Sequence, residues 1–104
     1  MPVISCQWVE GNCDTIPDSI VQEAMERDGM RRMTNEEAGK RYREMQLQAI
    51  IESTHYKVSV DGVAYTVPAY SRREDGSYSF TRKREAIRFA KLLHKLSNFL
   101  HLAR

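Results

Sequence analysis

The sequence predicts a single α+β domain over residues 1–104, in which an antiparallel β-meander packs against two long α-helices. Three observations predict this class: an Asp-Gly turn between two alternating segments, a helix-capping box at residues 34–37, and an amphipathic pattern over residues 81–100. We expect three strands in the meander, or four if residues 3–9 join it, and a short N-terminal helix before the first long one. A chain of 104 residues can bury a core without help from disulfides or metal ions.

The first predicted element is a short strand over residues 3–9, which are rich in β-branched and aromatic side chains. Alternation along this strand would point Ile4, Cys6 and Trp8 to one side. The chain has two cysteines, Cys6 and Cys13, whose spacing is not that of metal ligands. In a reducing compartment we expect both to be free thiols, with a disulfide across a turn at residues 11–12 as the alternative.

Two helices are predicted next. Pro17 and Asp18 suit the first turn of a short helix, and Gly29 suits the position after its last turn. The capping box Thr34-Asn35-Glu36-Glu37 then begins a long helix over residues 35–53, whose apolar residues recur at helical spacing.

The strongest local signal is the hairpin around Asp61-Gly62. A two-residue loop fixes the strand pairing and places six apolar side chains on one face. The expected pairs are Val60 with Val63, Val58 with Tyr65, and Tyr56 with Val67. Pro68 cannot donate to a ladder, so the second strand must bulge, bend or end there. A second turn at residues 72–76 then leads to a third strand at residues 77–80.

The last helix is predicted to run from an N-cap at Thr81 to about Leu100. Apolar residues line one side of this helix, and we expect that side to pack on the sheet. The residues expected in the core or in a buried interface are Tyr56, Val58, Val60, Val63, Tyr65, Val67, Phe80, Ile87, Phe89, Leu93 and Leu96.

Charge is distributed unevenly along the chain. Residues 55–104 hold ten Lys/Arg and four Asp/Glu, a net charge of +6, whereas residues 1–54 hold six and ten, a net charge of −4. Four bases of the last helix fall within about 60° of each other around its axis, opposite the apolar side. The candidate residues for binding nucleic acid or an acidic partner are Arg72, Arg73, Arg82, Lys83, Arg84, Arg88, Lys91 and Lys95. The plainer interpretation is the solvated face of an amphipathic helix.

The sequence lacks the patterns that mark common catalytic sites, namely a Gly-rich phosphate loop, His-Glu-x-x-His and a nucleophile elbow. His94 and His101 lie two helical turns apart, and two ligands at that separation do not make a metal site. We therefore expect no enzymatic activity, no cofactor and no bound metal. Neither a membrane-spanning apolar run nor a signal peptide is recognised, so the expected location is the cytoplasm, with no membrane contact.

Part of the chain resembles double-stranded-RNA-binding domains. The predicted order of helix, three strands and helix over residues 35–100 is similar to theirs, and Thr81-Arg82-Lys83-Arg84-Glu85-Ala86 resembles the opening of their last helix. That resemblance implies phosphate contacts by Arg82, Lys83 and Arg84. The chain departs from the family at Asp61-Gly62, which replaces a Gly-Pro-x-His loop.

The stretch from Tyr56 to Leu93 is also similar to the arm-binding domains of phage integrases. The shared residues are Ser79-Phe80-Thr81-Arg82-Lys83-Arg84-Glu85-Ala86, followed by Phe89. In that family the sheet face reads DNA, which implies roles for Lys57, Ser59 and Thr66 here.

Together these features predict a small non-enzymatic binding protein of the accessory or inhibitor type that phages and mobile elements encode. Its expected partner is acidic: a protein of a nucleic-acid-handling complex that it inhibits or modulates, or nucleic acid itself, bound through the last helix. Two alternatives remain open. One is docking through the acidic N-terminal half or through exposed residues such as Trp8 and Leu102, and the other is a homodimer that pairs the acidic and basic halves.

Overall fold

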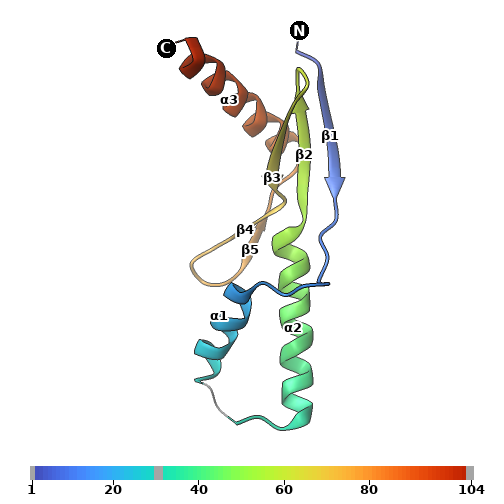
Figure 1. The fold of residues 1–104 in the computed structure, drawn as a ribbon, viewed down its shortest axis with the longest axis vertical. Coiled ribbons are helices and arrows are strands. Elements are labelled where there is room, and N and C mark those ends of the chain that lie inside the picture. Colours follow the sequence, from blue (N-terminus) through green and yellow to red (C-terminus); the bar gives the residue numbers. More distant parts are fainter. Residues whose placement is uncertain (1, 30–31, 103–104) are drawn as a thin grey trace.

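The computed structural model describes residues 2–29 and 32–102, with side chains described as far as residue 100, so the predicted roles of His101 and Leu102 lie outside it. Within these residues, three helices and two antiparallel sheets confirm the α+β class (Figure 1). The elements are β1 (Ile4–Val9), α1 (Asp18–Asp28), α2 (Asn35–Ser53), β2 (His55–Val60), β3 (Val63–Pro68), β4 (Tyr70–Arg72), β5 (Tyr78–Phe80) and α3 (Lys83–Leu102).

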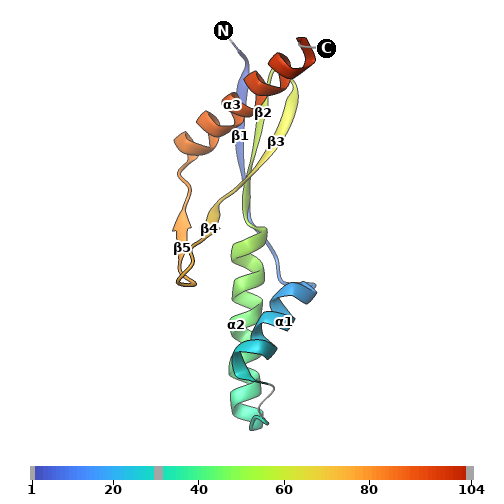
Figure 2. The same cartoon turned by 90° about the vertical axis from the view of Figure 1, so that its left-hand side faces the viewer.

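The molecule is elongated, with a sheet at one end and a helical arm of α1 and α2 at the other (Figures 1 and 2). Its extents are 58 × 27 × 23 Å. The radius of gyration of 18.1 Å exceeds the roughly 13 Å of a compact chain of this length. We predicted that both long helices cover the sheet, but α2 packs against α1 and β4 instead. Only Thr54 separates α2 from β2, so no loop is available to fold the helix back over the strands.

The main sheet has three antiparallel strands in the order β1-β2-β3. The predicted hairpin register is confirmed, from Val60 opposite Val63 to Tyr56 opposite Val67. Its turn residues Asp61 and Gly62 both have positive φ angles, of 51° and 85°, as a two-residue hairpin loop favours. Residues 4–9 form the strand whose membership in the sheet the sequence left open. Cys6 on this strand and Cys13 after it are free thiols, as expected.

The third predicted strand does not join this sheet. Instead, β5 pairs with β4 in a separate two-stranded hairpin, with Tyr70 opposite Phe80. The chain leaves the main sheet at Pro68, which has no N–H to continue a ladder. The next N–H, that of Ala69, donates to the Thr54 carbonyl at 3.1 Å. The Ala69 carbonyl accepts instead from the Thr81 N–H at 2.8 Å, so the chain changes partner at Ala69 and the new hairpin begins there.

The core lies between α3 and the main sheet and depends on small residues. Ala69, Ala86 and Ala90 have no exposed surface, which lets the α3 backbone come close to the strands. Of the predicted core residues, those buried are Tyr56, Val58, Val60 and Val67, and those partly buried are Tyr65, Ile87 and Leu93. The remaining four, exposed by 47% to 51%, are Val63, Phe80, Phe89 and Leu96. α3 packs mainly on β2 and less on β3 and β1, and these four side chains lie outside that contact.

The helix ends follow the predicted signals with one exception. Gly29 has a left-handed φ of 63° after α1, and Thr34 Oγ1 accepts a hydrogen bond from the Glu37 N–H at 3.2 Å before α2. α3 begins at Lys83, so Thr81 is not directly before the helix as predicted. The Thr81 N–H donates to the Ala69 carbonyl at 2.8 Å, which ties the start of α3 to the end of the sheet.

Gly11 should not tolerate a side chain, whereas Gly39 should. A Cβ atom at Gly11 would lie 2.4 Å from the Ile50 carbonyl oxygen and 2.7 Å from the Thr54 nitrogen, both backbone atoms. Gly11→Ala should therefore lower the free energy of unfolding by about 1–3 kcal/mol. Inside α2, the nearest atom to such a Cβ at Gly39 is Arg43 Nη1 at 3.9 Å. Gly39→Ala should thus raise the free energy by about 0.5–1 kcal/mol, as alanine favours a helix interior.

Urea unfolding of the two variants and the wild-type protein measures both effects. Because the substitutions are identical, an equal change at the two positions would contradict the close approach of the chain after β1 to the end of α2.

Candidate binding surface on the last helix

α3 is fixed to the sheet at its middle by His94. The Tyr65 hydroxyl and His94 Nδ1 are 2.7 Å apart, and the two rings meet edge to face with centroids 5.8 Å apart. His94 Nε2 lies 3.7 Å from Asp61 Oδ2 in the β2–β3 turn. The other oxygen of that carboxylate accepts a hydrogen bond from the Val3 N–H at 2.9 Å. The C-terminal end of α3 runs clear of the strands (Figure 1), and residues 95–100 are all exposed.

The basic face of α3 is formed by five exposed cations, Lys83, Arg84, Arg88, Lys91 and Lys95. The first four line a shallow concave surface together with Ile87, and the fifth lies about one turn further along. Within residues 2–29 and 32–102, none of the five has an ion-pair partner. Arg82 is exposed directly before the helix. The structure thus brings six of the eight predicted residues together at one element.

Arg72 and Arg73 lie elsewhere, on the β4–β5 hairpin. The Arg72 guanidinium pairs with both carboxylate oxygens of Glu23 on α1, with Nη1 at 2.5 Å from Oε2. Arg73 is exposed in the hairpin loop, where its N–H donates to the Ser77 carbonyl at 2.7 Å. The loop points away from α3 (Figures 1 and 2). These two arginines therefore do not extend the basic face, although the sequence led us to expect it.

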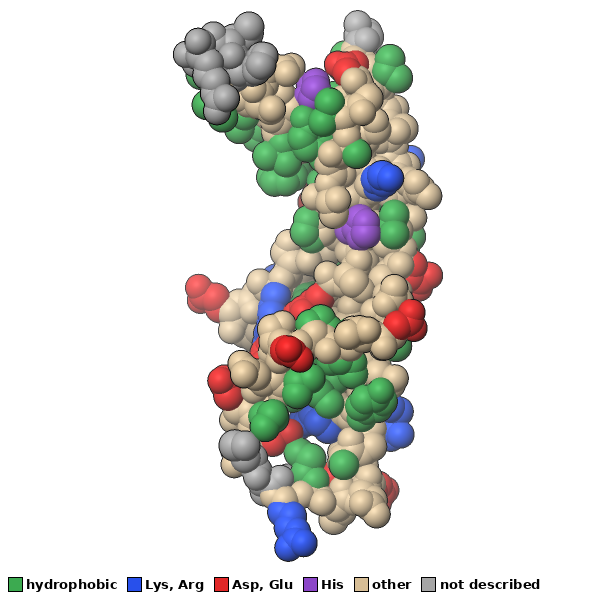
Figure 3. Space-filling model, in the orientation of Figure 1, with side chains coloured by type: hydrophobic (Ala, Val, Ile, Leu, Met, Phe, Trp, Pro, Cys, Tyr) green, Lys and Arg blue, Asp and Glu red, His purple; other side chains and the backbone are tan. Residues whose placement is uncertain are grey.

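An apolar stripe runs along α3 beside the basic face. It consists of Phe89, Leu92, Leu96, Phe99 and Leu100, which are between 47% and 66% exposed. Figure 3 shows hydrophobic side chains gathered on the underside of α3, facing the hollow above the β4–β5 hairpin. Positions 89, 92, 96 and 99 alternate between steps of three and four, the spacing of a coiled-coil core. Sequence reasoning placed Phe89 and Leu96 in the core or an interface but missed Leu92 and Phe99, although their spacing was visible.

The apolar stripe and the buried alanines together span about half of the circumference of α3, at 100° per residue. An apolar side of this width is wider than the part of the helix that the sheet covers. The sheet covers Ala86 and Ala90 but leaves the stripe in solvent. Contiguous exposed apolar patches of this kind mark interaction sites in water-exposed proteins. α3 therefore presents an apolar and a basic surface side by side.

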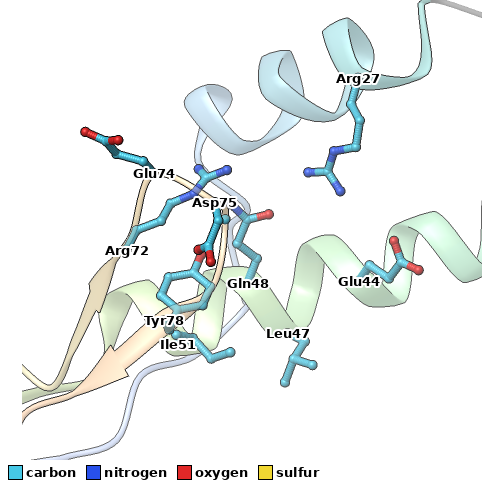
Figure 4. A pocket seen from close by; sticks show the side chains of 10 residues that line it. Arg27, Glu44, Leu47, Gln48, Ile51, Arg72, Glu74, Asp75 and Tyr78 are labelled. Carbon is cyan, nitrogen blue, oxygen red and sulfur yellow. The ribbon is translucent and has the colours of Figure 1, made fainter.

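A second recess lies where α1, α2 and the β4–β5 hairpin meet (Figure 4). Its lining mixes charges of both signs, including Arg27 from α1, Glu44 from α2 and Asp75 from the hairpin. The Tyr78 hydroxyl donates to Glu52 Oε1 at 2.9 Å. Partial burial, and then this hydrogen bond, raise the pKa of Tyr78 above its ordinary value. The contacts of this recess fasten the hairpin to the helical arm.

The described residues carry no group of three His, Cys, Asp or Glu side chains arranged to hold a metal ion. None of the helices in that part of the chain is both long and apolar enough to cross a membrane. Comparison of the chain with protein-family models, curated proteins and solved structures gave no match. What can be inferred about function therefore comes from the surfaces of α3.

Substituting each hairpin arginine in turn tests whether the ion pair between Arg72 and Glu23 holds the hairpin against α1. Arg72→Ala removes the ion pair with Glu23, whose side chains are 40% and 33% exposed. It should lower the free energy of unfolding by about 0.2–1 kcal/mol, the range for exposed pairs, and speed amide exchange in residues 70–80. Arg73→Ala, at the next residue along the hairpin, is the matched control and should leave both the free energy of unfolding and the amide exchange unchanged. Hydrogen–deuterium exchange measures the difference, and equal exchange in the two variants would show that the Glu23 pair does not hold the hairpin.

Proposed function

We propose that this protein is a small non-enzymatic binding protein whose α3 helix docks an acidic, amphipathic segment of a partner protein. The observation that carries the proposal is the apolar stripe beside the basic face on one fixed helix. A partner helix with apolar residues at the same spacing would cover the stripe. Acidic residues on its flank would meet Arg88 and Lys95, which occupy the positions where coiled coils place charges beside the core.

A protein partner would contact both surfaces of α3, whereas a nucleic-acid duplex would contact only the basic face. Phosphates would neutralise the basic face but leave Leu92, Leu96 and Phe99 in water. Fully burying one such side chain contributes roughly 1.5–3 kcal/mol relative to leaving it exposed. These residues start about half exposed, so each gains part of that amount. A partner that covers the stripe gains this contribution, and a duplex does not.

The partner is proposed to belong to a nucleic-acid-handling complex that this protein inhibits or modulates, as an accessory protein of a phage or mobile element would. The net charge of +6 on residues 55–104 supports this assignment. A surface that attracts both carboxylates and phosphates suits a place where protein and nucleic acid meet.

Direct nucleic-acid binding through the basic face is the alternative. Lys83 and Arg84 lie in the first turn of α3, where free N–H groups and the helix dipole also favour anions. The resemblance to double-stranded-RNA-binding domains also supports it and stays a prediction, whereas the resemblance to integrase arm-binding domains points to the sheet face instead.

Two probes and two pairs of substitutions separate these functions. The probes are a fluorescent helical peptide of three heptads, with leucine in the core and glutamate at the flanks, and a DNA duplex of mixed sequence. Leu92→Ala with Leu96→Ala should weaken peptide binding by about ten- to a hundredfold and leave duplex binding unchanged. Arg84→Glu with Arg88→Glu should weaken both, and any duplex binding should fall steeply as salt rises. Fluorescence anisotropy gives the Kd values.

Lys40→Ala, an exposed lysine on α2 of the helical arm, is the matched control and should change neither affinity. Docking on the apolar stripe is refuted if the wild-type protein does not bind the peptide at low salt, or if the leucine pair leaves peptide binding unchanged. Duplex binding that depends on Arg84 and Arg88, without peptide binding, would establish the alternative. Capture from a nuclease-treated host lysate, with the wild-type protein and the leucine variant in parallel, then identifies the partner.

A further inference from the structure

β1 is an edge strand that lacks the usual protections of an edge. It pairs with β2 on one side, in a sheet of order β1-β2-β3. Residues 3–9 contain neither a charged residue nor a proline, the groups that normally block edge-to-edge pairing. The opposite edge strand, β3, does end in a proline, Pro68. Val3, directly before this strand, and Trp8 within it are 77% and 44% exposed.

The hydrogen bonds at the start of β1 show which backbone groups face outward. The Val3 N–H donates to Asp61 Oδ1, and the Val3 carbonyl accepts from the Asp61 N–H, both at 2.9 Å. Val3 therefore faces β2, and so do residues 5, 7 and 9, because backbone groups alternate in direction along an antiparallel strand. The residues whose N–H and C=O groups face outward are Ile4, Cys6 and Trp8. No strand in the described part of the chain pairs with that side.

The polarity of residues 3–9 is symmetric about Cys6. If two copies paired antiparallel around that residue, the opposed residues would be Val3 with Val9, Ile4 with Trp8, Ser5 with Gln7, and Cys6 with itself. Apolar residues would meet apolar ones, polar would meet polar, and outward-facing groups would meet each other as a ladder requires. If the two strands were centred on Ser5 instead, Val3 would lie opposite Gln7. If they were centred on Gln7, Ser5 would lie opposite Val9.

We infer that two copies of this chain pair through β1 around a two-fold axis at Cys6, forming one continuous sheet of order β3-β2-β1-β1-β2-β3. Such an interface is self-complementary, as closed dimers require. The axis is perpendicular to the sheet, so both α3 helices lie on the same face. An extended segment of another protein could also add to this edge, but it would not require the symmetric polarity of residues 3–9. The inference does not rest on the proposed function, because β1 lies outside the docking surface on α3.

Charges placed at Ser5 and Gln7 test this register, because the side chain at position 5 of one copy lies opposite that at position 7 of the other. Both side chains lie on the sheet face away from the core, beside Ser59 and Lys57 of β2. Ser5→Glu with Gln7→Glu opposes like charges twice and should weaken the dimer by about tenfold or more. Ser5→Lys with Gln7→Glu, which differs only at residue 5, opposes unlike charges and should dimerise at least as tightly as the wild-type protein. Sedimentation velocity over a concentration series gives the Kd values.

Amide exchange of the wild-type protein gives a second measurement that needs no variant to fold. Raising the protein concentration should slow exchange at Ile4, Cys6 and Trp8, whose N–H groups face outward. The N–H groups of Ser5 and Gln7 already face β2 and should change little. The inference is overturned if the wild-type protein stays monomeric across the series, if the two charge variants dimerise equally, or if those three amides show no concentration dependence.

Discussion

The relative placement of the two ends of this molecule depends on Thr54, the single residue between α2 and β2. Its side chain is the buried polar one among the described residues. The hydroxyl donates to the Ile50 carbonyl at 2.6 Å and accepts from the Gly11 N–H at 3.0 Å. The Thr54 carbonyl accepts from Ala69 at the point where the chain leaves β3. Through the hydrogen bonds of its hydroxyl and its carbonyl, Thr54 therefore joins the end of the helical arm, the chain after β1 and the end of β3.

This junction makes the molecule long, and its length limits how much apolar surface it can bury. A one-residue link holds α2 beyond the end of β2, so the arm and the sheet form separate small clusters. On the arm the buried apolar residues are Ile20, Ala24 and Ala49, and on the sheet they lie beneath α3. A compact arrangement of the same chain would have covered more of the half-exposed side chains. The link holds the arm beyond the end of the sheet, and the apolar stripe of α3 stays exposed.

The features that were predicted from the sequence are those fixed by a few neighbouring residues. The Asp61-Gly62 turn set the β2–β3 register, Thr34 and Gly29 set helix ends, and the basic residues of α3 fall on one helix as expected. The features that were missed depend on residues distant in sequence. The packing of α2 against α1 and β4 joins segments far apart in sequence, and the loss of Arg72 from the basic face follows from Glu23 on another helix. Local patterns contain no information about these partners.

The two surfaces of α3 would contribute to binding in different ways. Charges act over a Debye length of about 8 Å at physiological salt, so the basic face would mainly speed the encounter with an acidic partner. The apolar stripe acts only on contact, and burying it would mainly slow dissociation. Both surfaces are held in place before binding, because His94 is fixed by Tyr65 and faces Asp61 while Ala86 and Ala90 seat the helix on the strands. A helix already ordered in this way loses little conformational entropy on docking, which leaves more of the contact energy for affinity.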